Sequence, residues 1–144
     1  MAVNFYDDNG IRFEYPEDWE IEDSQEGPVT TIALQSSEGP AFAIITVDDT
    51  MPTIEEVSEA AVEALRDEYP ALDATPVTET FAGFPGIGYD IEFISLDMVN
   101  ACSTRCVRTP RRTILVFGQW SDIEGDEPGE VVRAIRRSLA ETDA

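Results

Sequence analysis

Few of the side chains that ordinarily perform catalysis are present in this sequence. None of the 144 residues is a histidine or a lysine. The chain therefore has no imidazole base, no Ser–His or Cys–His nucleophile, no Schiff-base lysine and no histidine-ligated metal. We predict no catalytic residue, no metal site and no cofactor, and we favour a protein that is not an enzyme.

Carboxylates are the remaining candidates for acid–base or cation chemistry. Adjacent pairs occur at Asp7-Asp8, Asp48-Asp49 and Glu55-Glu56. Among 30 acidic residues such pairs are expected by chance, and neighbours on a strand point to opposite faces. The alternating acids from Asp122 to Asp126 resemble a calcium loop, but Gly125 is out of place and Arg133 occupies the position of the bidentate glutamate. A carboxylate-dependent hydrolase stays an alternative.

The two cysteines, Cys102 and Cys106, are four residues apart. On one extended strand they lie roughly 13 Å apart, which is too far for a disulfide, although a turn between them would close the gap. We predict two reduced thiols, at least one of them packed in the core.

Arginines are concentrated late in the chain. Residues 1–104 hold only Arg12 and Arg66, whereas four arginines gather around one turn, at Arg105, Arg108, Arg111 and Arg112. The simpler interpretation is that they pair with carboxylates of the same molecule. The alternative is a basic contact surface for an acidic partner or a small anion, because guanidinium groups match carboxylates and phosphates. These four arginines are our candidate binding residues, together with Trp19 and Trp120, which otherwise belong to the core.

The formal net charge is −21. Such a charge repels nucleic acid and anionic membrane surfaces, so we expect neither as a partner. An acidic chain without lysine also fits a proteome adapted to high salt, where screening makes this charge tolerable. The sequence has no run of about 20 apolar residues and no signal-peptide pattern. We expect a soluble cytoplasmic protein, unless a targeting peptide has been removed.

The first part of the chain predicts four strands followed by a helix. Asn9-Gly10 is typical of a tight turn, so residues 3–15 should form a hairpin. Further strands are predicted at residues 29–36 and 41–47, with residues 20–27 as a strand end and loop. Thr53 is a suitable N-cap with Glu56 three residues later, and Pro70 should end this helix near residue 69.

The second part predicts four more strands and a second helix. The strands are expected at residues 74–80, which is marginal, 87–93, 101–108 and 113–120, the last almost wholly apolar and therefore central. Pro128 suits a helix start, and Ile135 and Leu139 mark the buried stripe. Arg133, Arg136 and Arg137 lie off that stripe, and residues 141–144 should fray.

Tight turns between consecutive strands indicate an antiparallel sheet, and strands with two apolar faces need cover on both sides. The predicted fold is α+β: an α/β/α sandwich with a central antiparallel sheet, in the order ββββ-α-ββββ-α, forming a single domain over residues 1–144.

Two segments carry a family resemblance. Residues 13–19, Phe-Glu-Tyr-Pro-Glu-Asp-Trp, look like the strand-Pro-x-x-Trp opening of the PsbP-like family, and residues 83–89 are similar to the glycine-rich entry to its long middle strand. The family includes the photosystem subunit PsbP, the Ran-binding import factor Mog, DcrB and the Eag effector chaperones. The resemblance implies the same fold over most of the chain and a role in binding proteins, and it transfers no catalytic residue.

The resulting functional prediction is a non-enzymatic protein-binding or chaperone-like module with a protein partner, and a homodimer is another version. The alternatives are a small-molecule or anion-binding protein, or the carboxylate-dependent hydrolase.

Overall fold

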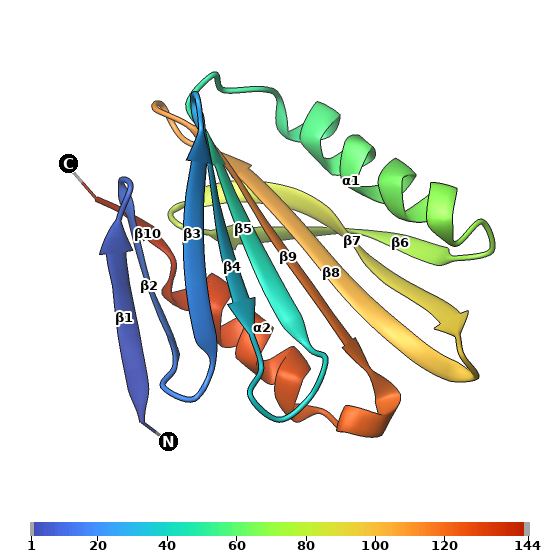
Figure 1. The fold of residues 1–144 in the computed structure, drawn as a ribbon. Helices are drawn as coiled ribbons and strands as arrows, with labels where there is room; N and C mark the ends of the chain where they lie inside the picture. Colours follow the sequence, from blue (N-terminus) through green and yellow to red (C-terminus); the bar gives the residue numbers. More distant parts are fainter. Residues whose placement is uncertain (1, 143–144) are drawn as a thin grey trace.

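The computed structural model describes residues 2–142, which form one large antiparallel sheet, one small sheet and two helices (Figure 1). The elements, in chain order, are β1 Val3–Asp8, β2 Ile11–Pro16, β3 Glu20–Glu26, β4 Val29–Gln35, β5 Phe42–Asp48, α1 Ile54–Glu68, β6 Asp73–Phe81, β7 Phe84–Ser95, β8 Met98–Arg108, β9 Thr113–Ser121, the 3-10 turn η1 Asp122–Glu124, α2 Glu127–Ser138 and β10 Ala140–Glu141.

The large sheet has seven strands in the order β3-β4-β5-β9-β8-β7-β6. Its middle strand is β9, in which Val116 stands opposite Ile45 of β5 on one side and Arg105 of β8 on the other. A strand that is paired on both edges and packed on both faces must be apolar on both faces. The prediction of a central strand at residues 113–120 is therefore confirmed.

The N-terminal hairpin belongs to a separate small sheet. Strand β2 pairs with β1 on one side and with the short β10 on the other. Asn9 and Gly10 have φ angles of 52° and 82°, as a type I′ turn requires, so the predicted hairpin is confirmed. The amide of Thr142 donates to the carbonyl of Gly10 over 2.8 Å and holds the described C-terminal end against this turn.

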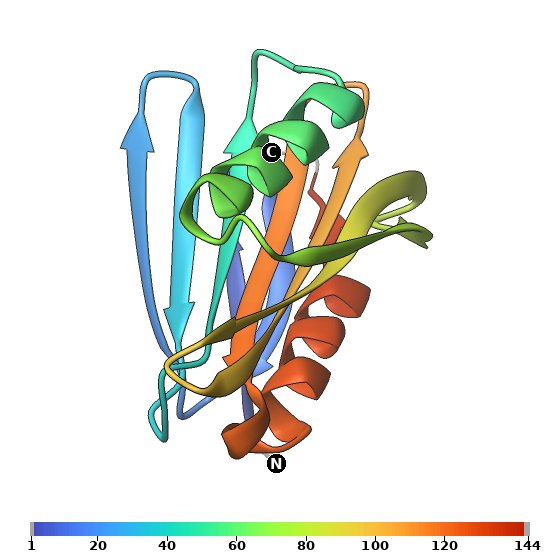
Figure 2. The ribbon, with the colours of Figure 1, turned by 90° about the vertical axis from the view of Figure 1, so that its right-hand side faces the viewer.

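The two helices pack on opposite faces of the large sheet (Figure 2). Val116 of β9 belongs to a core that it shares with Ile135 of α2, while its neighbour Phe117 packs against the core that contains Val62 of α1. Because successive side chains of a strand point to opposite faces, these two cores lie on the two sides of the sheet. The larger core also includes the inner side of the small sheet, through Phe13 of β2.

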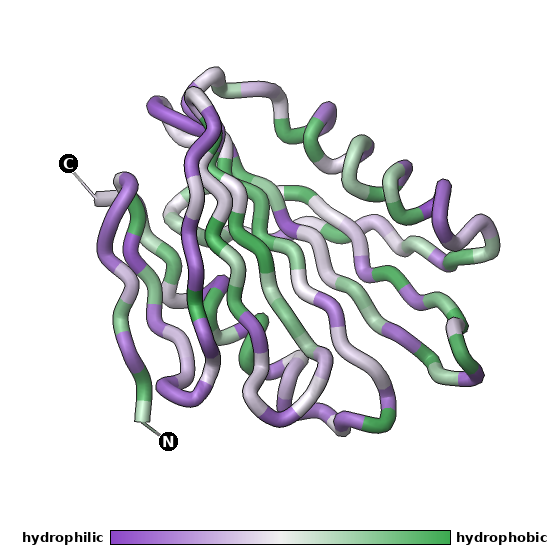
Figure 3. The backbone as a smooth tube through the Cα atoms, viewed as in Figure 1, coloured by the Kyte–Doolittle hydropathy of each residue, from purple (hydrophilic) through white to green (hydrophobic). Residues whose placement is uncertain are grey.

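Apolar residues are densest in the middle of the large sheet, on β5 and β9, and the edge strand β3 is mostly polar (Figure 3). Helix α1 packs mainly on β7, β8 and β9, so the same face of β4 and β5 is less covered. There the rings of Phe42 and Phe117 stand 6.0 Å apart and are half-buried.

The prediction of a mixed α+β fold with a large antiparallel sheet and two helices is confirmed, but its element order is wrong in two places. Residues 20–26 form the strand β3 and not a loop, so five strands precede α1. The pattern concealed this strand because β3 is an edge and only Ile21 packs against the core.

The second difference lies at the C-terminus. Glu141, where fraying was expected, pairs with β2 together with its neighbour Ala140, and the part of that prediction that concerns residues 143–144 lies outside the described residues. Within residues 2–142, no helix is long and apolar enough to cross a membrane.

Candidate functional site

The four arginines predicted as a binding group do not form one surface. Arg108 and Arg111 are exposed near the turn between β8 and β9, whereas Arg105 and Arg112 are buried at different places in the fold. The guanidinium of Arg112 donates to the carbonyl of Gly10 over 2.7 Å and lies 3.5 Å from a carboxylate oxygen of Glu141. Arg112 thus ties the small sheet to the large one.

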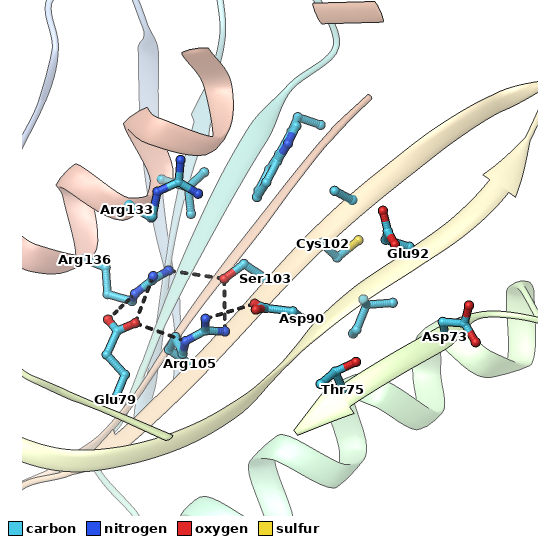
Figure 4. Close-up of a pocket in the computed structure, with 14 residues that line it drawn as sticks. Asp73, Thr75, Glu79, Asp90, Glu92, Cys102, Ser103, Arg105, Arg133 and Arg136 are labelled. Carbon is cyan, nitrogen blue, oxygen red and sulfur yellow. Dashed lines mark hydrogen bonds and ion pairs between the residues drawn. The ribbon is translucent and has the colours of Figure 1, made fainter. Parts of the chain in front are cut away.

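Arg105 lies in a charged cleft between α2 and strands β6, β7 and β8 (Figure 4). Its Nε donates to Glu79 over 3.3 Å, and its Nη2 donates to Asp90 over 2.9 Å. Arg136 of α2 donates to both oxygens of the same Glu79. The hydroxyl oxygen of Ser103 accepts from Arg105 and from Arg136, over 3.3 and 3.2 Å.

Two buried guanidinium groups thus share one carboxylate. Burial alone would raise the pKa of Glu79, but the hydrogen bonds and charges of Arg136 and Arg105 outweigh it, so this pKa lies below its ordinary value. Burial lowers the pKa of Arg136, and Glu79 opposes that change. An arginine stays protonated in proteins, so the network holds two full positive charges beside the cleft.

The prediction that Arg136 lies off the buried stripe of the second helix is wrong. Arg136 is only 3% exposed, and its guanidinium donates to Ser103 of β8 and to Glu79 of β6. No sequence pattern predicts the ion pair between Arg136 and Glu79, because Glu79 lies 57 residues earlier, in the strand that was considered marginal. Hydrophobic periodicity does not predict that a helical arginine is buried when its carboxylate partner is distant in the chain.

The opposite end of the cleft is acidic. Asp73 of β6 and Glu92 of β7 are direct cross-strand partners, and both line the cleft. Thr75 and the exposed Asp90 lie between this acidic pair and the arginines (Figure 4). The cleft has a volume of about 420 Å³, which is in the range of small-molecule sites.

The tryptophans and cysteines singled out in the sequence lie partly in the core and partly at the cleft. Trp19 is buried in the larger core, while Trp120 is half-buried and lines the charged cleft. Cys102 and Cys106 are free and buried, as predicted for reduced thiols, and burial raises the pKa of each to about 12.

A second feature lies at the far end of β7 and β8, where the hairpin turn exposes large apolar side chains. Ile94 is 74% exposed, Leu96 is 87% exposed, and Val99 stands opposite Ile94 across the hairpin. We call these three residues the hairpin tip. Ile94 and Val99 line a groove of about 620 Å³ that also includes Tyr69, whose ring stacks on Phe93 at 3.9 Å.

The turn of this hairpin has an unusual backbone conformation for its residue types. Leu96 and Asp97 both have positive φ angles, 54° and 61°, the geometry of a type I′ turn. The other two-residue turns with this geometry, Asn9-Gly10 and Ala82-Gly83, each contain glycine. Left-handed geometry at a leucine costs about 1 kcal/mol or more. In the sequence, the only sign of this turn is a Leu-Asp pair between two alternating strands, which was not predicted as a turn of this type.

Comparison with known proteins adds evidence on the fold. No family model matches the sequence, and no curated protein matches it. Among solved structures, the cyanobacterial PsbP protein CyanoP of Synechocystis matches with a TM-score of 0.65 and 13% identity, covering 97% of this chain and 92% of that one. LpqN of Mycobacterium tuberculosis, described as involved in cell envelope biogenesis, matches with a TM-score of 0.60 and 15% identity, covering 98% and 91%.

Proposed function

We propose that this chain, which has the PsbP-like fold, is a protein-binding module and that its hairpin tip takes a partner segment with apolar and basic side chains. The observation that carries this proposal is the exposure of Ile94, Leu96 and Val99 beside an apolar groove. Single exposed apolar residues need no explanation, but neighbouring ones next to a groove are typical of interaction sites.

Leu96 supports the proposal because two independent effects act against a leucine there. Its positive φ strains the backbone, and its side chain exposes apolar surface to water. Asparagine or glycine would remove both effects. A partner that buries the side chain of Leu96 gives a physical reason for leucine at this position.

The rim of the groove supports a partner with basic side chains. The groove is bordered by the carboxylates of Glu68, Asp73 and Glu92. A partner segment with lysine or arginine beside its apolar residues would match both parts of this surface, and the net charge of −21 would speed the encounter. The module needs no catalytic residue for this role.

Site-specific photocrosslinking in cells of the source organism tests the proposal. We expect Leu96→p-benzoylphenylalanine to form a crosslink to a partner segment that is apolar and basic. The same photoreactive residue at Phe5, which is exposed on β1 at a distant edge, should not form that crosslink. Replacing Glu68 by Gln should weaken crosslinking at position 96 because it removes rim charge.

Two outcomes would overturn this proposal: equal crosslinking at positions 5 and 96, or crosslinks whose partner segments are acidic. A crosslink between two copies of this chain would replace the partner protein by a homodimer, which sedimentation at several concentrations would verify. The half-covered face at Phe42 offers a further control position, where crosslinking to the same partner would move the site away from the hairpin tip.

A further inference from the structure

We propose that the charged cleft between α2 and strands β6 to β8 binds an α-amino acid with a cationic side chain, of the chemistry of arginine. This inference does not depend on the protein-binding role, although Asp73 and Glu92 line the cleft and also border the groove at the hairpin tip. The cleft is polarised, with buried guanidinium groups at one end and a pair of carboxylates at the other (Figure 4). A ligand with one negative and one positive end matches that arrangement.

The basic end has donors left for a carboxylate. Within residues 2–142, the guanidinium of Arg136 uses one N–H of each terminal nitrogen, on Ser103 and on Glu79, and retains the other two. The hydroxyl of Ser103 accepts two hydrogen bonds and donates none in the described structure. Arg133, one turn earlier on α2, lines the cleft and forms no ion pair with any described residue.

The acidic end is arranged for a cation. Directly opposed residues in an antiparallel pair have Cβ atoms about 5 Å apart, and like charges at such positions are destabilising. Asp73 and Glu92 are such a pair, and no described arginine neutralises either. A bound guanidinium or ammonium group would remove this repulsion by pairing with both carboxylates.

The spacing between the two ends selects the length of the ligand. Ser103 stands opposite Asp90, and Glu92 follows two residues later on the same face of β7, or about 7 Å along the strand. Asp90 uses one carboxylate oxygen for Arg105, and its other oxygen makes no hydrogen bond within the described residues. That oxygen can accept from an α-ammonium group, while an extended arginine side chain reaches toward Glu92.

The wall and the charge of the cleft agree with this ligand. Trp120, Val132 and Ile91 supply apolar surface for the methylene groups of the side chain. The lining holds three guanidinium groups and four carboxylates, so one negative charge is in excess. Arginine carries one net positive charge at neutral pH and would neutralise that excess.

Calorimetric titration of the whole protein with three small molecules tests the inference. We expect L-arginine to bind, and agmatine, which lacks the carboxylate, to bind at least about tenfold more weakly, the loss expected for a charge-assisted hydrogen bond. L-citrulline, which lacks the guanidinium charge, should be weakened by a similar factor. Equal binding of all three compounds, or no binding of L-arginine up to roughly 10 mM, would overturn the proposal.

Variants at exposed positions locate the binding. The double variant Asp73→Asn, Glu92→Gln should lose L-arginine binding by about tenfold or more and should fold at least as stably, because it removes a like-charge pair. Arg133→Gln should weaken the carboxylate end. Arg137→Gln, an exposed arginine of the same helix that does not line the cleft, is the matched control and should bind normally.

Unchanged binding in the double variant would refute this assignment of the acidic end. Binding of inorganic phosphate with no response to L-arginine would also refute it and would leave an anion site at Arg133 and Arg136. If L-arginine binds, a dipeptide with C-terminal arginine separates the two sources of the ligand. The arginine of this dipeptide has an amide in place of the α-ammonium group, so weaker binding would support the free amino acid and tighter binding would contradict the contact assigned to Asp90.

Discussion

At the scale of single residues, the network around Glu79 decides whether two buried positive charges are tolerated. Removing a partner from a buried ion pair is more damaging than replacing the whole pair, because an uncompensated charge stays behind. Arg105 and Arg136 are both buried and share this carboxylate, although Arg105 also pairs with Asp90. Glu79 therefore has a larger structural role than any exposed acid of this chain.

We predict that Glu79→Gln lowers the free energy of unfolding by about 2 kcal/mol, less than for a fully buried pair because 29% of the Glu79 side chain stays exposed. Denaturant titration at neutral pH measures this loss. Asp90→Asn, at a carboxylate that is 58% exposed, is the control and should lose less. Equal losses in the two variants would contradict the central position of Glu79.

The same residue predicts a dependence on pH. Because the pKa of Glu79 is lowered by Arg136 and Arg105 against the opposing effect of burial, its contribution is complete above the unfolded-state pKa, about 4.3. The contribution disappears as the pH falls through the lower folded-state value. The stability difference between the native sequence and Glu79→Gln should therefore shrink below about pH 4. If the stability difference between the two proteins stayed constant down to about pH 2.5, the carboxylate of Glu79 would not act through its charge.

The thiols give a separate prediction. Burial raises the pKa of Cys102 and Cys106 to about 12, so almost no thiolate is present at neutral pH. We expect no reaction of the folded protein with an aromatic disulfide reagent and reaction of both thiols after unfolding. Rapid labelling of one thiol in the folded state would mean that its strand opens locally.

At the scale of elements, the close packing of α2 against β9 depends on a glycine. A Cβ at Gly118 would lie 2.6 Å from a methyl carbon of Val132, which is buried and stiff because it is β-branched. We predict that Gly118→Ala lowers the free energy of unfolding by about 2 kcal/mol through overpacking.

A compensating change tests that explanation. Val132→Ala makes room at the same point, so the double variant Gly118→Ala, Val132→Ala should be more stable than the sum of the two single losses predicts, by about 1 kcal/mol. Denaturant titration of all four proteins measures this coupling. Additive losses would show that the helix is not seated through this contact.

At the hairpin turn between β7 and β8, a substitution is expected to stabilise the protein. Replacing Leu96-Asp97 by Asn-Gly should raise the free energy of unfolding by about 1 kcal/mol because it relieves two positive φ angles. The reverse change at the other turn, Asn9→Leu, should lower it by a similar amount. A destabilised Asn-Gly variant would contradict the strain assigned to Leu96.

At the scale of the whole molecule, the charge of −21 dominates. Raising KCl from about 0.1 M to about 1 M shortens the screening length from about 10 to about 3 Å, so the melting temperature should rise. A variant with Glu20, Glu22 and Glu26 of β3 changed to glutamine should gain less from salt, because these exposed acids share one edge strand. No stabilisation by salt would contradict both the screening explanation and the proposed adaptation to high salt.

The sequence by itself determined the local elements of this protein. The turn Asn9-Gly10, the N-cap Thr53 and the apolar run of β9 specify structure through neighbours in the chain, and each was predicted correctly. The hydroxyl of Thr53 accepts from the amide of Glu56 over 3.1 Å, as the spacing required. Periodicity also assigned the faces of the long strands, because side chains alternate whatever the sheet order is.

Only the tertiary structure decided which strands and charges meet. Strand β3 and the short β10 have weak patterns, because each pairs along a single edge and contributes little to the core. Arg105 and Arg136 find one carboxylate, Glu79, from two other elements, and Asp73 meets Glu92 through the register of β6 with β7. An ion pair depends on distance in space, which the order of strands sets and which spacing along the chain does not encode.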